Sequence, residues 1–150
     1  MNPNILATDQ FALVGVVDAD AYAASTVTSG WIDAKRFLNY LAVIAVGDFV
    51  ATATLNAKLQ QATDSSGTGA KDVTGKAITA LTQAGTDDNK QALINLHQSE
   101  LDVTGGFTHF RLSMTLGTAG GDLAGFVFGL NPTNGVASDN DLAAVDEIVA

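Results

Sequence analysis

Alternation of apolar and polar residues along the chain predicts β-strands. Two segments, Ala51–Gln61 and Phe107–Leu116, place an apolar residue at every second position, which is the period of a strand with one buried face. A helical period of 3.6 would scatter these residues around the helix. The positions expected to face the core are Ala53, Leu55, Ala57 and Leu59 in the first segment and Phe110, Leu112, Met114 and Leu116 in the second.

Two further segments are apolar on both sides of the expected strand. Tyr40–Val46 is apolar throughout, which predicts a strand buried on both faces. In Leu123–Leu130 the large residues share one side, expected to point to the core, and Gly125 and Gly129 lie on the other. Glycine inside a strand often marks the close approach of another backbone, so these two glycines are candidate contacts between subunits. Three shorter strands are expected in Phe11–Val17, Thr26–Ile32 and Ala92–Leu96.

Turn formers separate the predicted strands at intervals of about 10–15 residues, a spacing that suits an antiparallel sandwich. They lie at Asp64–Gly69, Gly85–Asn89 and Gly117–Gly121. Weaker helical patterns occur in Asp18–Ser25 and Asp139–Ala150. We therefore expect residues 1–150 to form a single all-β domain, an antiparallel, jelly-roll-like β-sandwich over about residues 11–130. A short N-terminal arm and a C-terminal arm of about residues 131–150 flank it.

The expected C-terminal arm combines acidic and apolar residues. Pro132, within the turn formers Asn131–Gly135, ends the last predicted strand, because proline cannot continue a central ladder. The arm then carries four carboxylates and no basic residue. We expect its apolar side chains to anchor it in a groove of a neighbouring subunit or of a partner. These candidate contact residues are Leu142, Val145, Ile148 and Val149.

Composition excludes several classes of protein. Of 150 residues, 47% are hydrophobic, enough apolar surface to offset the chain entropy lost on folding. The chain has 7 Lys+Arg against 16 Asp+Glu, a net charge of −9, which argues against a nucleic-acid partner. No apolar run approaches the ~20 residues that a bilayer requires, so no membrane partner is expected. The first basic residue is Lys35, so we expect no signal peptide and synthesis in a cytoplasm.

No motif in the sequence supports catalysis, a cofactor or a metal. Ala70–Ala77 has the spacing of a phosphate-binding loop but lacks its first glycine and its final hydroxyl residue. Asp18 and Asp139 each begin a calcium-loop spacing that breaks after the second ligand. His97 and His109 flank one connection and could meet, with Glu100 or Asp102 nearby, but no zinc motif contains them. No cysteine and no G-x-S-x-G sequence is present, so we expect a protein without enzymatic activity.

Aromatic residues offer little for a sugar-binding platform. The phenylalanines have the spacing of core residues, which leaves Trp31 and Tyr22 as the candidates for exposed rings. The phenylalanines expected in the core are Phe37, Phe107, Phe110, Phe126 and Phe128.

From Trp31 to about Leu130, the order of segments resembles a known group. A buried strand (FLNYLAVIAVG) precedes an alternating one (ATATLNAKLQQATD), and a glycine-serine turn leads to KDVTGKAITAL. INLHQSELDVTGG, FTHFRLSMTLG and DLAGFVFGL follow. This order is similar to that of the small β-sandwich, jelly-roll-like proteins of tailed double-stranded DNA phages that act as capsid decoration or cement proteins.

The resemblance implies a non-enzymatic virion protein on the outer surface of a phage head, where it stabilises contacts between major capsid subunits. The major capsid protein is then the expected partner. A core rich in small side chains favours a homo-oligomer, for which we expect a trimer rather than a dimer. The alternatives are a carbohydrate- or host-surface-binding module on the same fold and a head-completion or tail connector protein.

Overall fold

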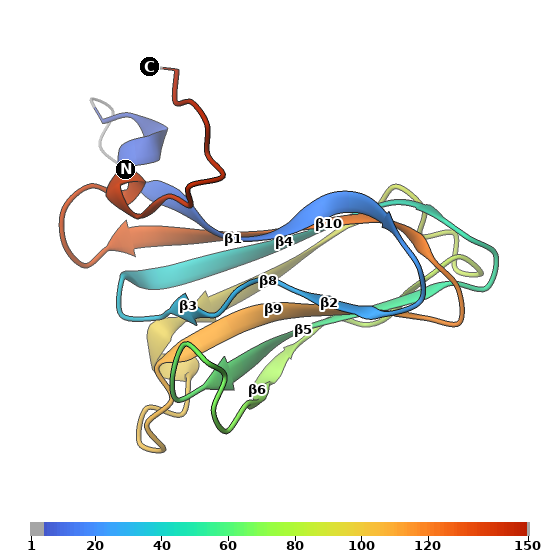
Figure 1. The fold of residues 1–150 in the computed structure, drawn as a ribbon, viewed down its shortest axis with the longest axis horizontal. Helices are drawn as coiled ribbons and strands as arrows, with labels where there is room; N and C mark the ends of the chain where they lie inside the picture. The colour runs from blue at the N-terminus through green and yellow to red at the C-terminus, as the bar shows by residue number, and fades with distance from the viewer. Residues whose placement is uncertain (1–4, 150) are drawn as a thin grey trace.

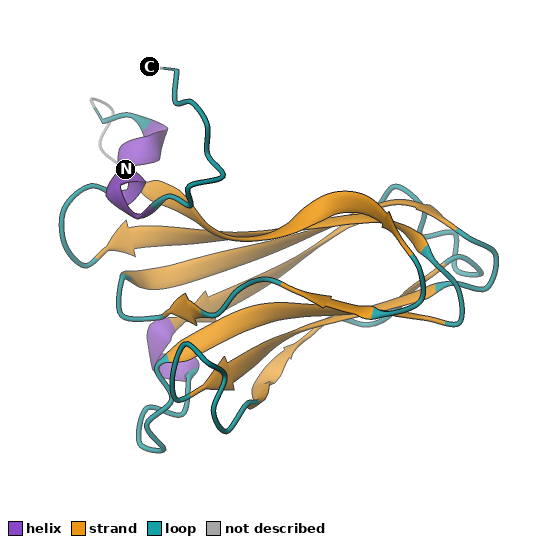
Figure 2. Cartoon of the chain, in the orientation of Figure 1, coloured by secondary structure: helices purple, strands orange, loops and turns teal. Residues whose placement is uncertain are grey.

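The computed structural model describes residues 5–149; residues 1–4 and 150, at the tips of the two expected arms, lie outside the described residues. The described chain consists of strands, three short 3₁₀ turns and loops, with no α-helix (Figures 1 and 2). The strands are β1 (Phe11–Tyr22), β2 (Thr26–Thr28), β3 (Ile32–Asp33), β4 (Phe37–Phe49), β5 (Thr54–Ala62), β6 (Lys71–Ala77), β7 (Leu81–Thr82), β8 (Gln91–His97), β9 (His109–Gly117) and β10 (Gly121–Pro132). The 3₁₀ turns are η1 (Ala7–Asp9), η2 (Gln98–Glu100) and η3 (Ala137–Asn140).

The strand order defines a jelly roll. One sheet has the order β1-β10-β4-β8, and the other has the order β2-β9-β5-β6, with β3 beside β9 and β7 beside β5. All the pairings are antiparallel. Along β1, β2, β4, β5, β6, β8, β9 and β10 the chain crosses from one sheet to the other at every connection except that from β5 to β6, which is the arrangement of a jelly roll. The predicted fold class, an all-β antiparallel sandwich of jelly-roll type, is confirmed.

The two clearest sequence patterns are confirmed, including which side faces the core. In β5, Leu55, Ala57 and Leu59 are buried, and so is Ala53 just before the strand. In β9, the four expected residues from Phe110 to Leu116 are also buried. Polar side chains on the alternate positions mark the solvent side of each strand, so the sequence alone determines the orientation.

The central strand β4 differs from the expectation of burial on both faces. Its inward residues, among them Tyr40, Ala42 and Ile44, are buried. Its outward residues, Leu41 and Val43, are only half-buried. No second layer covers the outer side of this sheet among the described residues (Figure 1).

In β10 the expected orientation is reversed. Phe126 and Phe128, expected in the core, are half-buried on the outer side, and the glycines face inward. A Cβ on Gly129 would lie 2.4 Å from the Phe37 ring, and one on Gly125 would lie 2.8 Å from Leu112. The two glycines therefore make room for core side chains of their own subunit, and they are not the close contact with another subunit that the sequence indicated.

Neither helical pattern forms a helix. Asp18–Ser25 instead continues β1 to Tyr22, because its residues pair with the start of β10, where Ala21 lies opposite Asp122. In the segment that begins at Asp139, only the 3₁₀ turn η3 is helical, and the described residues after it form turns and extended chain.

We predict that Leu55→Asp unfolds the subunit, because it buries an unpaired charge at a position that is 0% exposed. Lys58→Ala, on the opposite side of the same strand, should change the free energy of unfolding by less than about 0.5 kcal/mol, because the ion pair that it removes is exposed to solvent. Chemical denaturation of both variants measures this, and equal effects would contradict the orientation of β5.

We predict that Gly129→Ala destabilises the subunit by about 1–3 kcal/mol, because the added methyl group overlaps the Phe37 ring. Gly30→Ala is the matched control, since no atom lies within 4 Å of the added methyl group there. Thermal unfolding of the two variants should show a lower melting temperature for Gly129→Ala alone. A similar loss in both would mean that glycine at 129 is not required by packing.

Candidate interaction surface

The outer side of the β1-β10-β4-β8 sheet is apolar over most of four successive rows of residues. Its polar positions lie towards the β8 edge, at Asn39, Gln91, Asn95 and His97. The register places Phe11 beside Leu130 in the first row and Val16, Phe126, Val43 and Leu93 side by side in the third. We call this surface the apolar face. Its apolar side chains are Phe11, Leu13, Val16, Leu41, Val43, Ala45, Leu93, Ala124, Phe126, Phe128 and Leu130.

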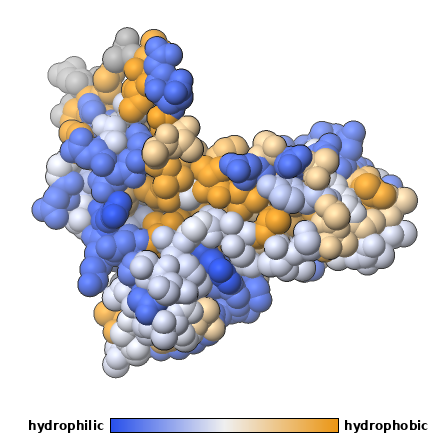
Figure 3. All heavy atoms as spheres, in the orientation of Figure 1, coloured by the Kyte–Doolittle hydropathy of each residue, from blue (hydrophilic) through white to orange (hydrophobic). Residues whose placement is uncertain are grey.

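The apolar face is accessible rather than covered by another part of the subunit. Leu93 is 60% exposed and Phe11 is 37% exposed, at opposite edges of the sheet. A hollow of about 240 Å³ lies between Phe11, Leu41, Phe128 and Leu130. Figure 3 shows hydrophobic residues gathered in the corner between the sheet and the projecting terminal segments. Soluble monomers rarely expose so wide an apolar surface unless it binds something.

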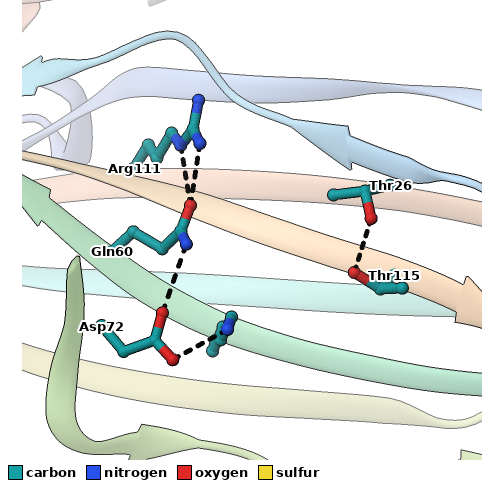
Figure 4. A network of polar contacts seen from close by, with 6 residues as sticks. Thr26, Gln60, Asp72, Arg111 and Thr115 are labelled. Atoms are coloured by element: carbon teal, nitrogen blue, oxygen red, sulfur yellow. Dashed lines mark hydrogen bonds and ion pairs between the residues drawn. The ribbon is translucent and has the colours of Figure 1, made fainter. Parts of the chain in front are cut away.

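The outer side of the other sheet is polar and tightly hydrogen-bonded. Arg111 donates from Nε and Nη2 to Gln60 Oε1 at 3.0 and 2.9 Å, and Gln60 Nε2 donates to Asp72 (Figure 4). Lys58 Nζ lies 2.8 Å from Asp72 Oδ2, and this hydrogen bond holds the pKa of Asp72 below its ordinary value. The hydroxyl groups of Thr26 in β2 and Thr115 in β9 also form a hydrogen bond, with the two oxygens 2.8 Å apart (Figure 4). Because these groups bind one another, this side offers few free polar groups to a ligand.

The two candidate sugar-binding rings are both engaged within the subunit. The Arg111 guanidinium lies 4.4 Å from the centre of the Trp31 ring, and Gly67 lies against its indole nitrogen. The Tyr22 hydroxyl donates to the carbonyl of Asp18. The Arg111 contact therefore occupies one face of the ring that a sugar platform would need.

Acidic residues without an ion pair lie at the two ends of the apolar face. At one end, Asp20 and Asp122 line a shallow hollow beside Ala45 and Gly47. At the other end, the C-terminal segment carries Asp146 and Glu147. In the described part of the chain, the ion pairs use other carboxylates: Asp72, Asp87, Glu100 and Asp102. At the end with the C-terminal segment, Lys35 and Arg36 are also without an ion pair to any described residue, and their carbonyls accept hydrogen bonds from Thr133. Among residues 5–149, unpaired acidic groups therefore stand without nearby unpaired basic groups only at the end with Asp20 and Asp122.

The C-terminal segment is partly attached to the sandwich. Leu13 N donates to Asp141 Oδ1 at 2.6 Å, and Leu142 N donates to the carbonyl of Leu13 at 2.9 Å. Ala137 is fully buried. Of the expected anchors, Leu142 and Val145 are half-buried, whereas Ile148 and Val149 are 44% and 85% exposed. The sequence missed the role of Asp141, whose carboxylate holds the segment against β1.

The structure keeps the two histidines apart. His97 ends β8 in one sheet and His109 begins β9 in the other, and the two strands do not pair with each other. His97 Nδ1 contacts Ser99 Oγ at 2.7 Å, two residues away on an exposed turn. Within the described range, His, Asp and Glu form no group of three or more that could hold a metal ion. The same residues include no helix of the length and apolarity that a membrane span needs.

No family model matches the chain, and no curated protein matches it in sequence. A chain of infectious bursal disease virus, Gx strain, is 18% identical with a TM-score of 0.45, and the match covers 92% of this chain but only 38% of the viral one. A chain from empty particles of Cowpea mosaic virus is 11% identical with a TM-score of 0.39, and the match covers 87% of this chain and 90% of the viral one. TmCBM61, solved with β-1,4-galactotriose, is 9% identical with a TM-score of 0.36, and the match covers 87% of this chain and 99% of TmCBM61. The jelly-roll assignment rests on the strand order described above and not on these distant matches.

We predict that Asp141→Ala releases the C-terminal segment from β1, because it removes a charge-assisted hydrogen bond to Leu13 N. The free energy of unfolding should fall by about 1–2 kcal/mol, and limited proteolysis should cut residues 133–149 faster. Asp146→Ala is the control, since Asp146 is exposed and makes no hydrogen bond within residues 5–149. Equal protease resistance of the two variants would contradict this role of Asp141.

Proposed function

We propose that the chain is a non-enzymatic structural protein of a virion: a decoration or cement protein on the outer surface of a phage head that stabilises contacts between major capsid subunits. The sequence resemblance to small phage head proteins supports this, as does the jelly-roll fold, which viral capsid domains use widely. Because fold does not determine function, the proposal depends on a surface suited to binding protein.

The observation that carries the proposal is the C-terminal segment. Asp141 and Leu142 attach it to β1, and the residues after them continue without secondary structure to the exposed Ile148 and Val149. The N-terminal segment, in which Ile5 and Leu6 are exposed, begins at the same end of the molecule (Figure 1). Apolar side chains on an extended chain can enter a groove of a partner, and the ordering is then driven by their burial.

Self-association belongs to the same proposal, because the sandwich leaves a wide apolar surface uncovered. The expectation of a trimer rested on the small side chains of the core and on a close approach of Gly125 and Gly129 between subunits. Both glycines instead face their own core, so only the first reason is left. The carbohydrate-binding alternative loses its platform where Arg111 covers Trp31.

We predict that the double substitution Ile148→Asp with Val149→Asp weakens binding to heads by at least about tenfold, since each buried apolar side chain contributes about 1.5–3 kcal/mol. The measurement is co-sedimentation of purified protein with phage heads that lack it, which gives affinity and stoichiometry. Ala143→Asp with Ala144→Asp is the matched control, because it adds the same charges to exposed positions of the same segment.

Loss of binding in the Ile148/Val149 variant alone would support attachment through these anchors. Wild-type protein that does not bind heads at all would remove the virion proposal, and equal binding by both variants would remove the role of the C-terminal segment. Circular dichroism of each variant should show an unchanged sheet signal, because the substituted residues lie outside the core.

A further inference from the structure

We propose that the apolar face is covered by the same face of a second copy of this chain, in a two-fold symmetric dimer of stacked sheets. This gives the self-association proposed above a surface, but it is tested on the purified protein without any head. Three properties support this dimer: the area of the face, its apolar centre and the negative charge of the whole protein.

The face is large enough for a stable dimer. Four strands spaced about 4.8 Å apart, with four outward rows about 7 Å apart, give it roughly 500 Å². Two such faces in contact bury roughly 1,000 Å², about the least that a specific interface needs, and the terminal segments add to this area. Sheets stack in this way about 10 Å apart, and side chains such as Phe126 and Phe128 would interdigitate.

The centre of the face suits a copy of itself. The register places Phe126 beside Val43, with Val16 and Leu93 in the same row, and all four are uncharged and apolar. A symmetric contact brings the central row of one copy against that of the other, and an apolar surface is complementary to itself. Two copies that each carry a net charge of −9 can approach here without opposing like charges at the centre.

The terminal segments determine the direction of stacking. They stand off the sheet on its outer side, at the end where β1 begins (Figure 1). Two copies with these segments at the same end would collide, so the strands of the two copies must run in opposite directions. The end of one copy that carries Lys35, Arg36 and the C-terminal segment then approaches the end where the other copy carries Asp20 and Asp122.

This arrangement predicts an unusual response to salt. Each copy carries a net charge of −9, and salt screens the repulsion between the two copies, while the apolar centre is not weakened by salt. The dimer should therefore become tighter as sodium chloride is raised. A partner protein with basic groups around an apolar patch would instead be attracted to the negative charge of this chain and would bind more weakly in salt.

Analytical ultracentrifugation over a range of protein concentrations, at about 50 mM and about 500 mM sodium chloride, tests the proposal. We expect a particle of twice the 15.4 kDa chain mass at micromolar concentration and a several-fold lower dissociation constant at the higher salt. Leu93→Glu should raise the dissociation constant by at least about tenfold, because it places a charge within a desolvated contact. Leu93 is 60% exposed, so this variant should fold normally.

Phe126→Glu, at the centre of the face, should leave the protein monomeric. Asn56→Glu is the matched control: it adds one negative charge to an exposed position on the outer side of the other sheet and should dimerise like the wild type. A monomer at all concentrations, a trimer, a dimer weakened by salt or a dimer unaffected by Leu93→Glu and Phe126→Glu would each overturn the proposal. None of these outcomes depends on head binding, so the two proposals stand or fall separately.

Discussion

The aromatic layer that joins the two sheets depends on the absence of a side chain at Gly129. The Phe37 ring lies against this glycine and meets Tyr40 edge-on, with ring centres 5.9 Å apart. The Tyr40 ring in turn packs against the Phe110 ring of the opposite sheet, with ring centres 4.6 Å apart. The Tyr40 hydroxyl accepts a hydrogen bond from Phe37 N and donates to the carbonyl of Asp33. Burial raises the pKa of Tyr40, so its hydroxyl stays protonated and keeps donating.

This layer has a direct consequence for the outer surface. Successive residues of a strand point to opposite sides, so an inward Gly129 places Phe128 and Leu130 outward. In β4, an inward Tyr40 places Leu41 outward in the same way. Packing of the core determines the direction of these outward residues but does not require them to be apolar. Their apolar character is therefore unexplained by the stability of the single subunit, and it points to a contact beyond it.

The sequence predicted most of the fold because polar residues mark the solvent side of several strands. In β5, Asn56 and Lys58 alternate with Leu55 and Ala57, and both the strand and its orientation were predicted correctly. In β10, neither side is polar, so the alternation indicated a strand without indicating which side faces inward. That choice depends on Phe37, a residue distant in sequence that fills the space over Gly129. The same lack of polar residues made β4 look buried on both faces.

Some candidate contacts can be found from a local sequence pattern, and others only from the fold. Ile148 and Val149, which the sequence offered as candidate contacts, are exposed, and they follow the turn formers that end the last strand. The apolar face was not recognisable, because its residues come from four strands that only the topology brings side by side. The role of Asp141 was also hidden, since its partner Leu13 lies at the other end of the chain. Local patterns identify elements, whereas a surface built from distant strands requires the fold.

The attachment of the C-terminal segment also affects how copies of this chain can associate. A free edge of a sheet offers unpaired N–H and C=O groups to any other strand, and such edge contacts can continue into aggregates. At Leu13 of the edge strand β1, both backbone groups are already bonded, one to the Asp141 carboxylate and the other to Leu142 N. This blocks part of one edge while the apolar face stays accessible. A two-fold contact buries the same face of both subunits and leaves none free, so association through it stops at the dimer. Association through a sheet edge can continue to further subunits.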